Sequence, residues 1–207
     1  LVINLGRLGF LVDISPEDML DTLGAVLEGH YEQDERFLLR CEIGGQEPQL
    51  ALNDVVLHKW NIARMIEFET WVDGRFVYTQ RSDGLIISTP TGSTAYALSG
   101  GGPLLTPDLD AIAMVPICPH TLSDRPLVIA ANQEVTIRLL AREGTGAGVA
   151  IDGHSIGPIN PEDTLRISAA SKRIKLVHPP GYDFYGILRS KLYWGRDVRK
   201  RTDQQES

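Results

Sequence analysis

The strongest constraint on the fold is a long succession of short apolar runs between residues 36 and 178, each ended by turn residues. Short runs rich in Val, Ile, Leu and aromatic side chains, bounded by Gly, Pro, Asn or Asp, are typical of β-strands. Asp73-Gly74 between two runs indicates a hairpin, and Asp152-Gly153 repeats the signal. The sequence therefore predicts a sandwich or barrel-like β domain over residues 36–178. The runs are 37–43, 51–60, 65–73, 75–81, 84–88, 111–117, 127–131, 134–140, 148–151, 164–170 and 173–178.

Helices are predicted near both ends of the chain. Ser15 is suited to an N-cap and Pro16 to the first helical position, and apolar residues then recur at helical spacing to about Glu28. Residues 1–10 before this helix have the pattern of a strand followed by a glycine-rich turn. A second, short helix is predicted at 187–194.

The composition argues against several classes of protein. No apolar run reaches the length of about 18 residues that crosses a bilayer, and nothing resembles a signal peptide, so we expect a cytoplasmic protein without a membrane partner. The formal net charge of −7 opposes binding to nucleic acid. Cys41 and Cys118 stand apart, which predicts two reduced core thiols and neither a zinc site nor a disulfide.

The most distinctive local pattern runs from Arg81 to Pro103 and reads RSDGLIISTPTGSTAYALSGGGP. Its apolar part predicts a buried strand, and the hydroxyls of Thr91 to Thr94 are placed to cap a helix over 95–98. A strand leading through Gly, Ser and Thr into a helix directs N–H groups and hydroxyls at one spot, which suits an anionic or nucleotide ligand. The same residue types also occur in turns that only reverse the chain, so the pattern alone leaves both interpretations open.

Four segments, in order, resemble motifs of the NAD kinases: GRLGFL (6–11), LNDVVL (52–57), SDGLIISTPTGSTAYALSGGGP (82–103) and PICPHTLSDRPLVI (116–129). IDG at 151–153 and LRSKLYWG at 188–195 also resemble the family, with fewer matching residues over that part of the chain. The resemblance implies a mainly β chain, with a β-sandwich NAD-binding domain over 36–178. Residues 1–35 would then be a remnant of an α/β N-terminal domain, to which 179–207 return. Members of the family commonly form homodimers or homotetramers, and we expect the same here.

The resemblance also implies a reaction. NAD kinases phosphorylate the 2′-hydroxyl of the adenosine ribose of NAD, using ATP or polyphosphate, and the product is NADP. A divalent metal, Mg²⁺, would arrive with ATP. The family's Gly-Gly-Asp-Gly motif, whose aspartate is the general base, does not occur in this sequence. Because phosphoryl transfer depends on positioning and charge stabilisation, we expect little activity from this polypeptide alone and assign it no catalytic or metal-binding residue.

Ligand contacts are carried over from the family residue by residue. The acidic residue after Asn53 is usually Glu in the family and is Asp54 here, which shortens its reach. Tyr96 would stack on adenine. The predicted dinucleotide-binding residues are Phe10, Asn53, Asp54, Arg64, Arg81, Asp83, Thr94, Ala95, Tyr96, Ser99 and His154.

Arg81 and Asp83 flank Ser82, so on one strand they would lie on the same face and could form an ion pair. The resemblance places Asp83 at the adenine edge and Arg81 near the substrate phosphates across a subunit contact. An arginine suits that place because its planar fork binds phosphate oxygens in pairs.

Two other functions are compatible with parts of the sequence. A lipid or sphingoid-base kinase of the same superfamily would share the aspartate motif but needs an apolar pocket, which the polar segment around Tyr96 does not favour. A non-catalytic dinucleotide-binding oligomerisation domain would bind NAD without turnover. The sequence leaves open the phosphoryl donor, the choice between NAD and NADH, and feedback by NADP.

Overall fold

The computed structural model describes residues 10, 11, 14, 16–60, 64–121, 123–141 and 146–194. The chain divides into two compact units. The larger unit is Glu35–Ile174, and the smaller one combines Leu1–Asp34 with Lys175–Ser207. Both boundaries fall inside long strands that belong in part to each unit. The domain boundaries expected near 35 and 178 for the whole protein stay a prediction.

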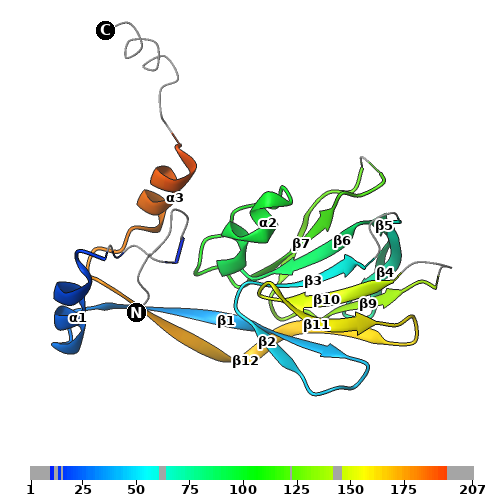
Figure 1. Cartoon of the computed structure of the whole chain (residues 1–207), viewed down its shortest axis with the longest axis horizontal. Helices are drawn as coiled ribbons and strands as arrows, with labels where there is room; N and C mark the ends of the chain where they lie inside the picture. Colours follow the sequence, from blue (N-terminus) through cyan, green and yellow to red (C-terminus); the bar gives the residue numbers. More distant parts are fainter. Residues whose placement is uncertain are drawn as a thin grey trace, which may run out of the picture. The chain divides into compact units, whose positions relative to one another are not determined.

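Two six-stranded antiparallel sheets form the larger unit (Figure 1). The first has the order β2-β1-β12-β9-β4-β5, and the second has the order β11-β10-β3-β6-β7-β8. The strands are β1 (Glu32–Ile43), β2 (Gln49–Ala51), β3 (Asp54–Lys59), β4 (Ile66–Val72), β5 (Arg75–Ser82), β6 (Gly84–Ser88), β7 (Ala111–Ile117), β8 (Leu127–Ala130), β9 (Val135–Leu139), β10 (Ala147–Ile151), β11 (His154–Ile159) and β12 (Thr164–His178).

The mainly β prediction is confirmed, and the predicted runs fall on strands. Asp73-Gly74 and Asp152-Gly153 form the expected hairpin turns, with all four residues at positive φ. The strands differ from the predicted runs in more than their end residues at β2, which no separate run predicts, and at β11 and β12. The runs 164–170 and 173–178 belong to one continuous strand, β12, and β11 has no run that predicts it, because Gly157 and Pro158 interrupt its apolar pattern.

The main core lies between the two sheets. Val55 and Leu57 of β3 and Leu85 of β6 contribute from the second sheet, and Phe68 and Ile137 contribute from the first. All five side chains are at most 1% exposed. Because side chains alternate along a strand, Val56, between Val55 and Leu57, must face the other side of the second sheet.

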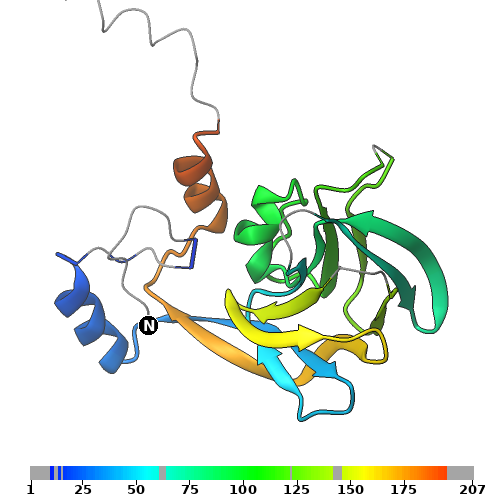
Figure 2. The same cartoon turned by 45° about the vertical axis from the view of Figure 1, so that its right-hand side comes forward.

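That outer face is covered by the segment that follows β6, which Figure 2 shows lying against the second sheet. Val56 and Ile86 pack there against Ala97, which is fully buried. The segment consists of a 3₁₀ turn, η1 (Thr91–Thr94), and a single helical turn, α2 (Tyr96–Ser99). It therefore fixes the residues around Tyr96 on a rigid sheet.

The prediction that the hydroxyls of Thr91, Ser93 and Thr94 cap a helix over 95–98 is wrong. Ser93 Oγ donates to the carbonyl of Pro90 at 2.6 Å, and Thr94 Oγ1 donates to the carbonyl of Thr91 at 3.1 Å. The N-cap of α2 is Ala95, which has no side-chain acceptor. Ser93 Oγ also accepts from the backbone N–H of Leu105 at 3.0 Å, and Thr91 Oγ1 accepts from Arg36 Nη1 at 3.3 Å. The hydroxyls thus have partners other than the helix N-terminus, because side-chain to backbone bonds compete with helix capping.

Among its described residues, the smaller unit contains two helices, α1 (Met19–Leu27) and α3 (Phe184–Leu192). The predicted first helix begins later than expected, with Asp18 as N-cap. The proposed cap Ser15 lies outside the described residues, and so does the strand and turn predicted over residues 1–10, apart from Phe10. The predicted helix at 187–194 begins earlier, at Phe184, and ends at Leu192 because Tyr193 takes a left-handed conformation with φ of 58°.

The two cysteines differ from the prediction. Cys41 is buried, and burial raises the pKa of its thiol to about 12. Cys118 is exposed rather than part of the core, because the chain leaves β7 there with φ of 44°. Within the described part of the chain, no helix is long and apolar enough to cross a membrane.

Candidate functional site

A cleft of about 570 Å³ lies on the outer face of the second sheet. It brings together the start of β3, the η1–α2 segment and the turn between β10 and β11. Asp54, Val56 and His58 form its floor because alternate residues of β3 share one face. The lining residues are Asn53, Asp54, Val56, His58, Ala95, Tyr96, Ala150, Asp152 and Gly153.

The Asp152 carboxylate holds one wall of the cleft in place. It accepts hydrogen bonds from the backbone N–H groups of Leu52 at 2.8 Å, Asn53 at 2.7 Å and Asp54 at 3.1 Å. The backbone N–H of Asp152 in turn donates to the carbonyl of Asp54 at 3.1 Å. Three consecutive donors on one carboxylate fix the entry to β3, so the side chains of Asn53 and Asp54 are preorganised.

Asp54 is a buried acid in this cleft, with only 4% of its surface exposed. Burial, and after it the charge of Asp152, raise the pKa of the Asp54 carboxyl to about 6. The group is therefore largely ionised at neutral pH and can accept hydrogen bonds from a ligand's hydroxyls. It takes up a proton in mildly acidic solution.

Asn53 contributes a second polar group. Its Oδ1 atom is buried and has no hydrogen-bond partner in the structure. A buried acceptor without a donor costs free energy, and a ligand that supplies one recovers it.

Tyr96 and Ala95 form the opposite wall. The ring of Tyr96 is 47% exposed although it belongs to a helical turn packed on the sheet, so it can contact a ligand. The turn before it is held close to β3: a Cβ on Gly92 would collide with the backbone carbonyl of Asn53. Thr89 Oγ1 also donates to the carbonyl of Leu52 at 2.7 Å. The two walls are thus joined by close contacts to the backbone of Leu52 and Asn53.

The structure gathers only part of the predicted set in this cleft. Asn53, Asp54, Ala95 and Tyr96 line it. Thr94 adjoins Ala95 and is half-buried, whereas Ser99 is exposed and does not line the cleft. His154 follows Gly153 in the hairpin turn and is exposed, with Nδ1 3.1 Å from the carbonyl of Asp152.

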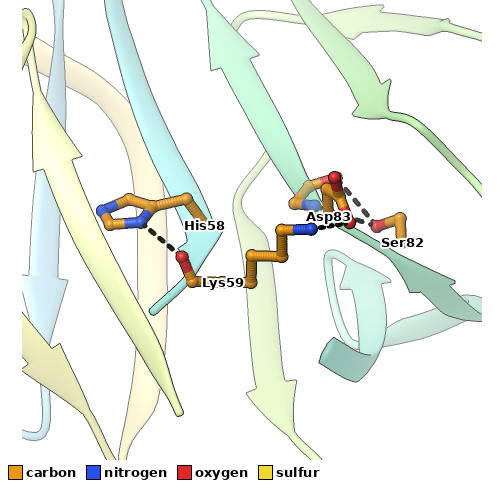
Figure 3. Close-up of polar contacts among 5 residues, drawn as sticks. His58, Lys59, Ser82 and Asp83 are labelled. Carbon is orange, nitrogen blue, oxygen red and sulfur yellow. Dashed lines mark hydrogen bonds and ion pairs between the residues drawn. The ribbon is translucent and has the colours of Figure 1, made fainter. Parts of the chain in front are cut away.

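Asp83 has a different partner from the one expected. Its carboxylate forms an ion pair with Lys59 Nζ at 2.7 Å, not with Arg81, and Figure 3 shows the lysine side chain reaching across from β3. The alternation assumed for Arg81 and Asp83 is broken because the chain bends at Asp83 between β5 and β6. A hydrogen bond from Ser82 Oγ to the carbonyl of Gly84, at 2.9 Å, holds that bend.

The remaining predicted residues lie away from the cleft walls or in the other unit. Arg64 precedes β4 and Arg81 is near the end of β5; both are exposed and neither lines the cleft. Phe10 belongs to the smaller unit, where its side chain is 8% exposed. Their ligand contacts stay predictions.

Sequence reasoning did not select His58 or Asp152 as site residues. His58 could have been found from Asp54, because a residue four positions along a strand lies on the same face. Asp152 could have been found from its hairpin turn, but its bonds to residues 52–54 depend on how β10 pairs with β3, which places Ile151 opposite Val55.

In the described ranges, no group of three or more His, Cys, Asp or Glu side chains is arranged to hold a metal ion. The cleft acids therefore do not form a protein cage for Mg²⁺, which prefers octahedral oxygen ligands and keeps several waters.

Comparison with known proteins identifies the relatives of this chain. Residues 52–179 match the family model described as the ATP-NAD kinase C-terminal domain. The chain is 52% identical to an NAD kinase of Teredinibacter turnerae over 93% of its own length and 67% of the relative. It is 50% identical to an NAD kinase of Acinetobacter baylyi over 99% of its length and 68% of the relative. The chain thus spans about two thirds of the length of these curated relatives.

Solved structures agree with the sequence matches. A yeast NADH kinase complexed with NADH superposes with a TM-score of 0.88 at 26% identity, over 94% of this chain and 60% of that one. An Archaeoglobus fulgidus NAD kinase in complex with ATP superposes with a TM-score of 0.76 at 27% identity, over 92% of this chain and 72% of that one. The chain, with its two β-sheets and the cleft beside Tyr96, belongs to the NAD kinase family.

Proposed function

We propose that the whole protein is an NAD kinase, which transfers a phosphoryl group from ATP or polyphosphate to the 2′-hydroxyl of the adenosine ribose of NAD and releases NADP. The observation that carries the proposal is the cleft itself. It unites residues from three segments far apart in the sequence, and four of them match positions that the family uses for NAD: Asn53, Asp54, Ala95 and Tyr96.

The adenosine half of NAD fits the chemistry of the two walls. The exposed Tyr96 ring offers a stacking surface for adenine, and the Ala95 backbone lies beside it to read a base edge. The ionised Asp54 carboxylate accepts hydrogen bonds from the ribose hydroxyls, while Asn53 supplies an amide. A lipid substrate would meet Asp54 and Asp152 in the same space, so the polar lining favours NAD over a lipid or sphingoid base.

The catalytic base lies outside this set. In our proposal the aspartate of the Gly-Gly-Asp-Gly motif, which the present 207 residues do not contain, takes the proton from the 2′-hydroxyl in the whole protein. The residues of this chain bind and orient NAD. Because the described residues offer no cage for a divalent ion, we propose that Mg²⁺ comes with the phosphates of ATP.

The proposal also includes the predicted residues outside the cleft walls. We propose that Arg81 acts near the substrate phosphates of a neighbouring subunit, since it is exposed and lies outside the cleft of its own chain, and that Asp83 contacts the adenine edge. The contact by Arg81 requires a homodimer or homotetramer, which stays a prediction, as does the cytoplasmic location. Arg64, Phe10 and His154 are retained as further dinucleotide contacts.

The test is a coupled assay for NADP formation by the whole protein with NAD, ATP and magnesium, beside a titration of NAD binding. The proposal predicts turnover, and an Asp54→Ala variant that binds NAD about 10- to 100-fold more weakly, which is the loss of a hydrogen bond to a charged group. Binding without turnover would instead support a non-catalytic dinucleotide-binding protein. Absence of NAD binding would contradict both.

A further inference from the structure

The cleft beside Tyr96 has an acidic lining. Asp54 and Asp152 both line it, and none of the described lining residues is a lysine or an arginine. His58 is the one side chain among them that can carry a positive charge, and it stands four positions along β3 from Asp54, about 13 Å between Cα atoms. These lining residues therefore offer no basic side chain to an anion bound beside Asp54.

The two carboxylates differ in how far their charge is compensated. Asp152 accepts hydrogen bonds from three consecutive backbone N–H groups, those of residues 52–54. The Asp54 carboxylate has no hydrogen-bond donor or cation as a partner in the described part of the chain, although the residue is only 4% exposed. Burial and the charge of Asp152 both act against its ionised form. Asp54 thus carries the less compensated of the two charges in the cleft.

The proposed reaction changes the group that Asp54 faces. In NAD the 2′-hydroxyl is neutral and donates a hydrogen bond, which a carboxylate accepts. Phosphoryl transfer breaks the O2′–H bond and forms an O2′–P bond; the proton goes to the general base, and ADP leaves when ATP is the donor. A phosphate monoester carries a charge of about −1.5 to −2 at neutral pH, on oxygens that accept hydrogen bonds. A hydrogen-bond donor is thus replaced by a negatively charged acceptor.

We propose that the Asp54 carboxylate discriminates between substrate and product: it binds the free ribose hydroxyls of NAD, repels the 2′-phosphate of NADP and thereby promotes product release. The inference rests on the proposed function. Like charges repel more strongly in a site shielded from water than in bulk solvent, and Asp54 is shielded. The two ribose hydroxyls are vicinal, so the repulsion acts whichever of them Asp54 contacts.

The experiment measures the dissociation constants of NAD and NADP for the whole protein and for Asp54→Asn, at about pH 8, where the Asp54 carboxyl is ionised. Asparagine has the same shape without the charge, and its amide can donate to a phosphate oxygen. Asp54→Asn should bind NADP about 5- to 50-fold more tightly than wild type and should bind NAD more weakly. A variant that merely damages the fold would bind both ligands more weakly. Asp54→Glu keeps the charge and should bind NADP no more tightly than wild type.

A second pair of ligands shows whether the effect is local to the 2′ position. The isomers 2′-AMP and 5′-AMP carry the same phosphate group on different ribose oxygens. Asp54→Asn should strengthen the binding of 2′-AMP and weaken that of 5′-AMP, which retains both ribose hydroxyls.

Asp73→Asn is the charge-matched control. It also removes one negative charge, but Asp73 lies in the turn between β4 and β5 of the first sheet and does not line the cleft. All four dissociation constants should therefore stay as in wild type, which separates a local repulsion from an effect of net charge.

The proposal is overturned if Asp54→Asn leaves the affinity for NADP unchanged or lowers it, or if Asp73→Asn raises that affinity by as much. Either result leaves the proposed function standing as long as the whole protein binds NAD and converts it to NADP. If wild type bound neither NAD nor 5′-AMP, the proposed function and the role of Asp54 in product release would both fail.

Discussion

The carboxylate of Asp152 accepts a hydrogen bond from the backbone N–H of Asn53 at 2.7 Å, and thereby joins the turn between β10 and β11 to the entry of β3. The same oxygen accepts from Asp54, whose own carboxyl is buried in the cleft. The Asp152 carboxylate thus bonds to backbone N–H groups, while the Asp54 carboxylate remains available to a ligand.

Replacing Asp152 by Asn tests this arrangement. An amide cannot accept from three N–H groups as a carboxylate does, so Asp152→Asn should lower the free energy of unfolding by about 1–3 kcal/mol and weaken NAD binding as well. It should also lower the pKa of Asp54, because it removes a neighbouring negative charge. Urea unfolding and an NAD titration measure the first two effects.

Asp73→Asn is the control for that variant. Asp73 occupies the same position in the other Asp-Gly turn and accepts from the backbone N–H of Glu134 at 2.9 Å, but it lies in the first sheet. It should leave NAD binding unchanged. Equal loss of NAD affinity in both variants would mean that the link between Asp152 and β3 has no special role.

The raised pKa of Asp54 predicts that the stability of the fold depends on pH. Its pKa is raised from 3.8 to about 6 in the fold, so between these values the folded protein binds more protons than the unfolded chain. Stability contributed by this group therefore falls as pH rises from about 4 to 6, and Asp54→Asn should remove that fall. Urea unfolding of both proteins across this range is the measurement, and parallel curves would show that Asp54 titrates normally.

Tyr96→Ala should weaken NAD binding about 5- to 150-fold, the range of base stacking on an aromatic ring, with little change in the midpoint of thermal unfolding, since the ring is 47% exposed. Tyr96→Phe keeps the ring and should bind within about two-fold of wild type if stacking is the main contribution. Unchanged affinity in Tyr96→Ala would place adenine elsewhere.

Gly92→Ala should destabilise the protein by about 1–3 kcal/mol, because the new Cβ meets the backbone carbonyl of Asn53 and the chain must move. Gly24→Ala is the control: Gly24 lies in α1, where a Cβ meets nothing within 4 Å, and alanine favours a helix. The change in the free energy of unfolding should have opposite signs in the two variants. A neutral Gly92→Ala would show that the two walls are not fastened at this point.

Much of the β architecture follows from short-range pattern. Residues 84–88 are apolar apart from their ends and form β6, which is buried along its whole length, and the Asp-Gly turns need positive φ that few other pairs tolerate. By contrast, β11 escaped prediction because Gly157 and Pro158 lie within it and its pairing with β10 contains a register shift. Its place is set by the neighbouring strand and not by its own residues.

The site was predictable where a family motif covered it and not where it depends on strand register. Lys59 meets Asp83 because β3 and β6 pair with His58 opposite Gly84, a relation that no local sequence pattern contains. The same pairing logic joins β10 to β3 and brings Asp152 to residues 52–54. Contacts between side chains that are distant in sequence and brought together by strand register could therefore be identified only from the structure.

A crystal structure of the whole protein with bound NAD tests the central claim most directly. The account predicts density for the adenosine half in the cleft, with adenine on the Tyr96 ring and a ribose hydroxyl within hydrogen-bonding distance of Asp54. Adenosine bound at any other place, with this cleft left open, would contradict it.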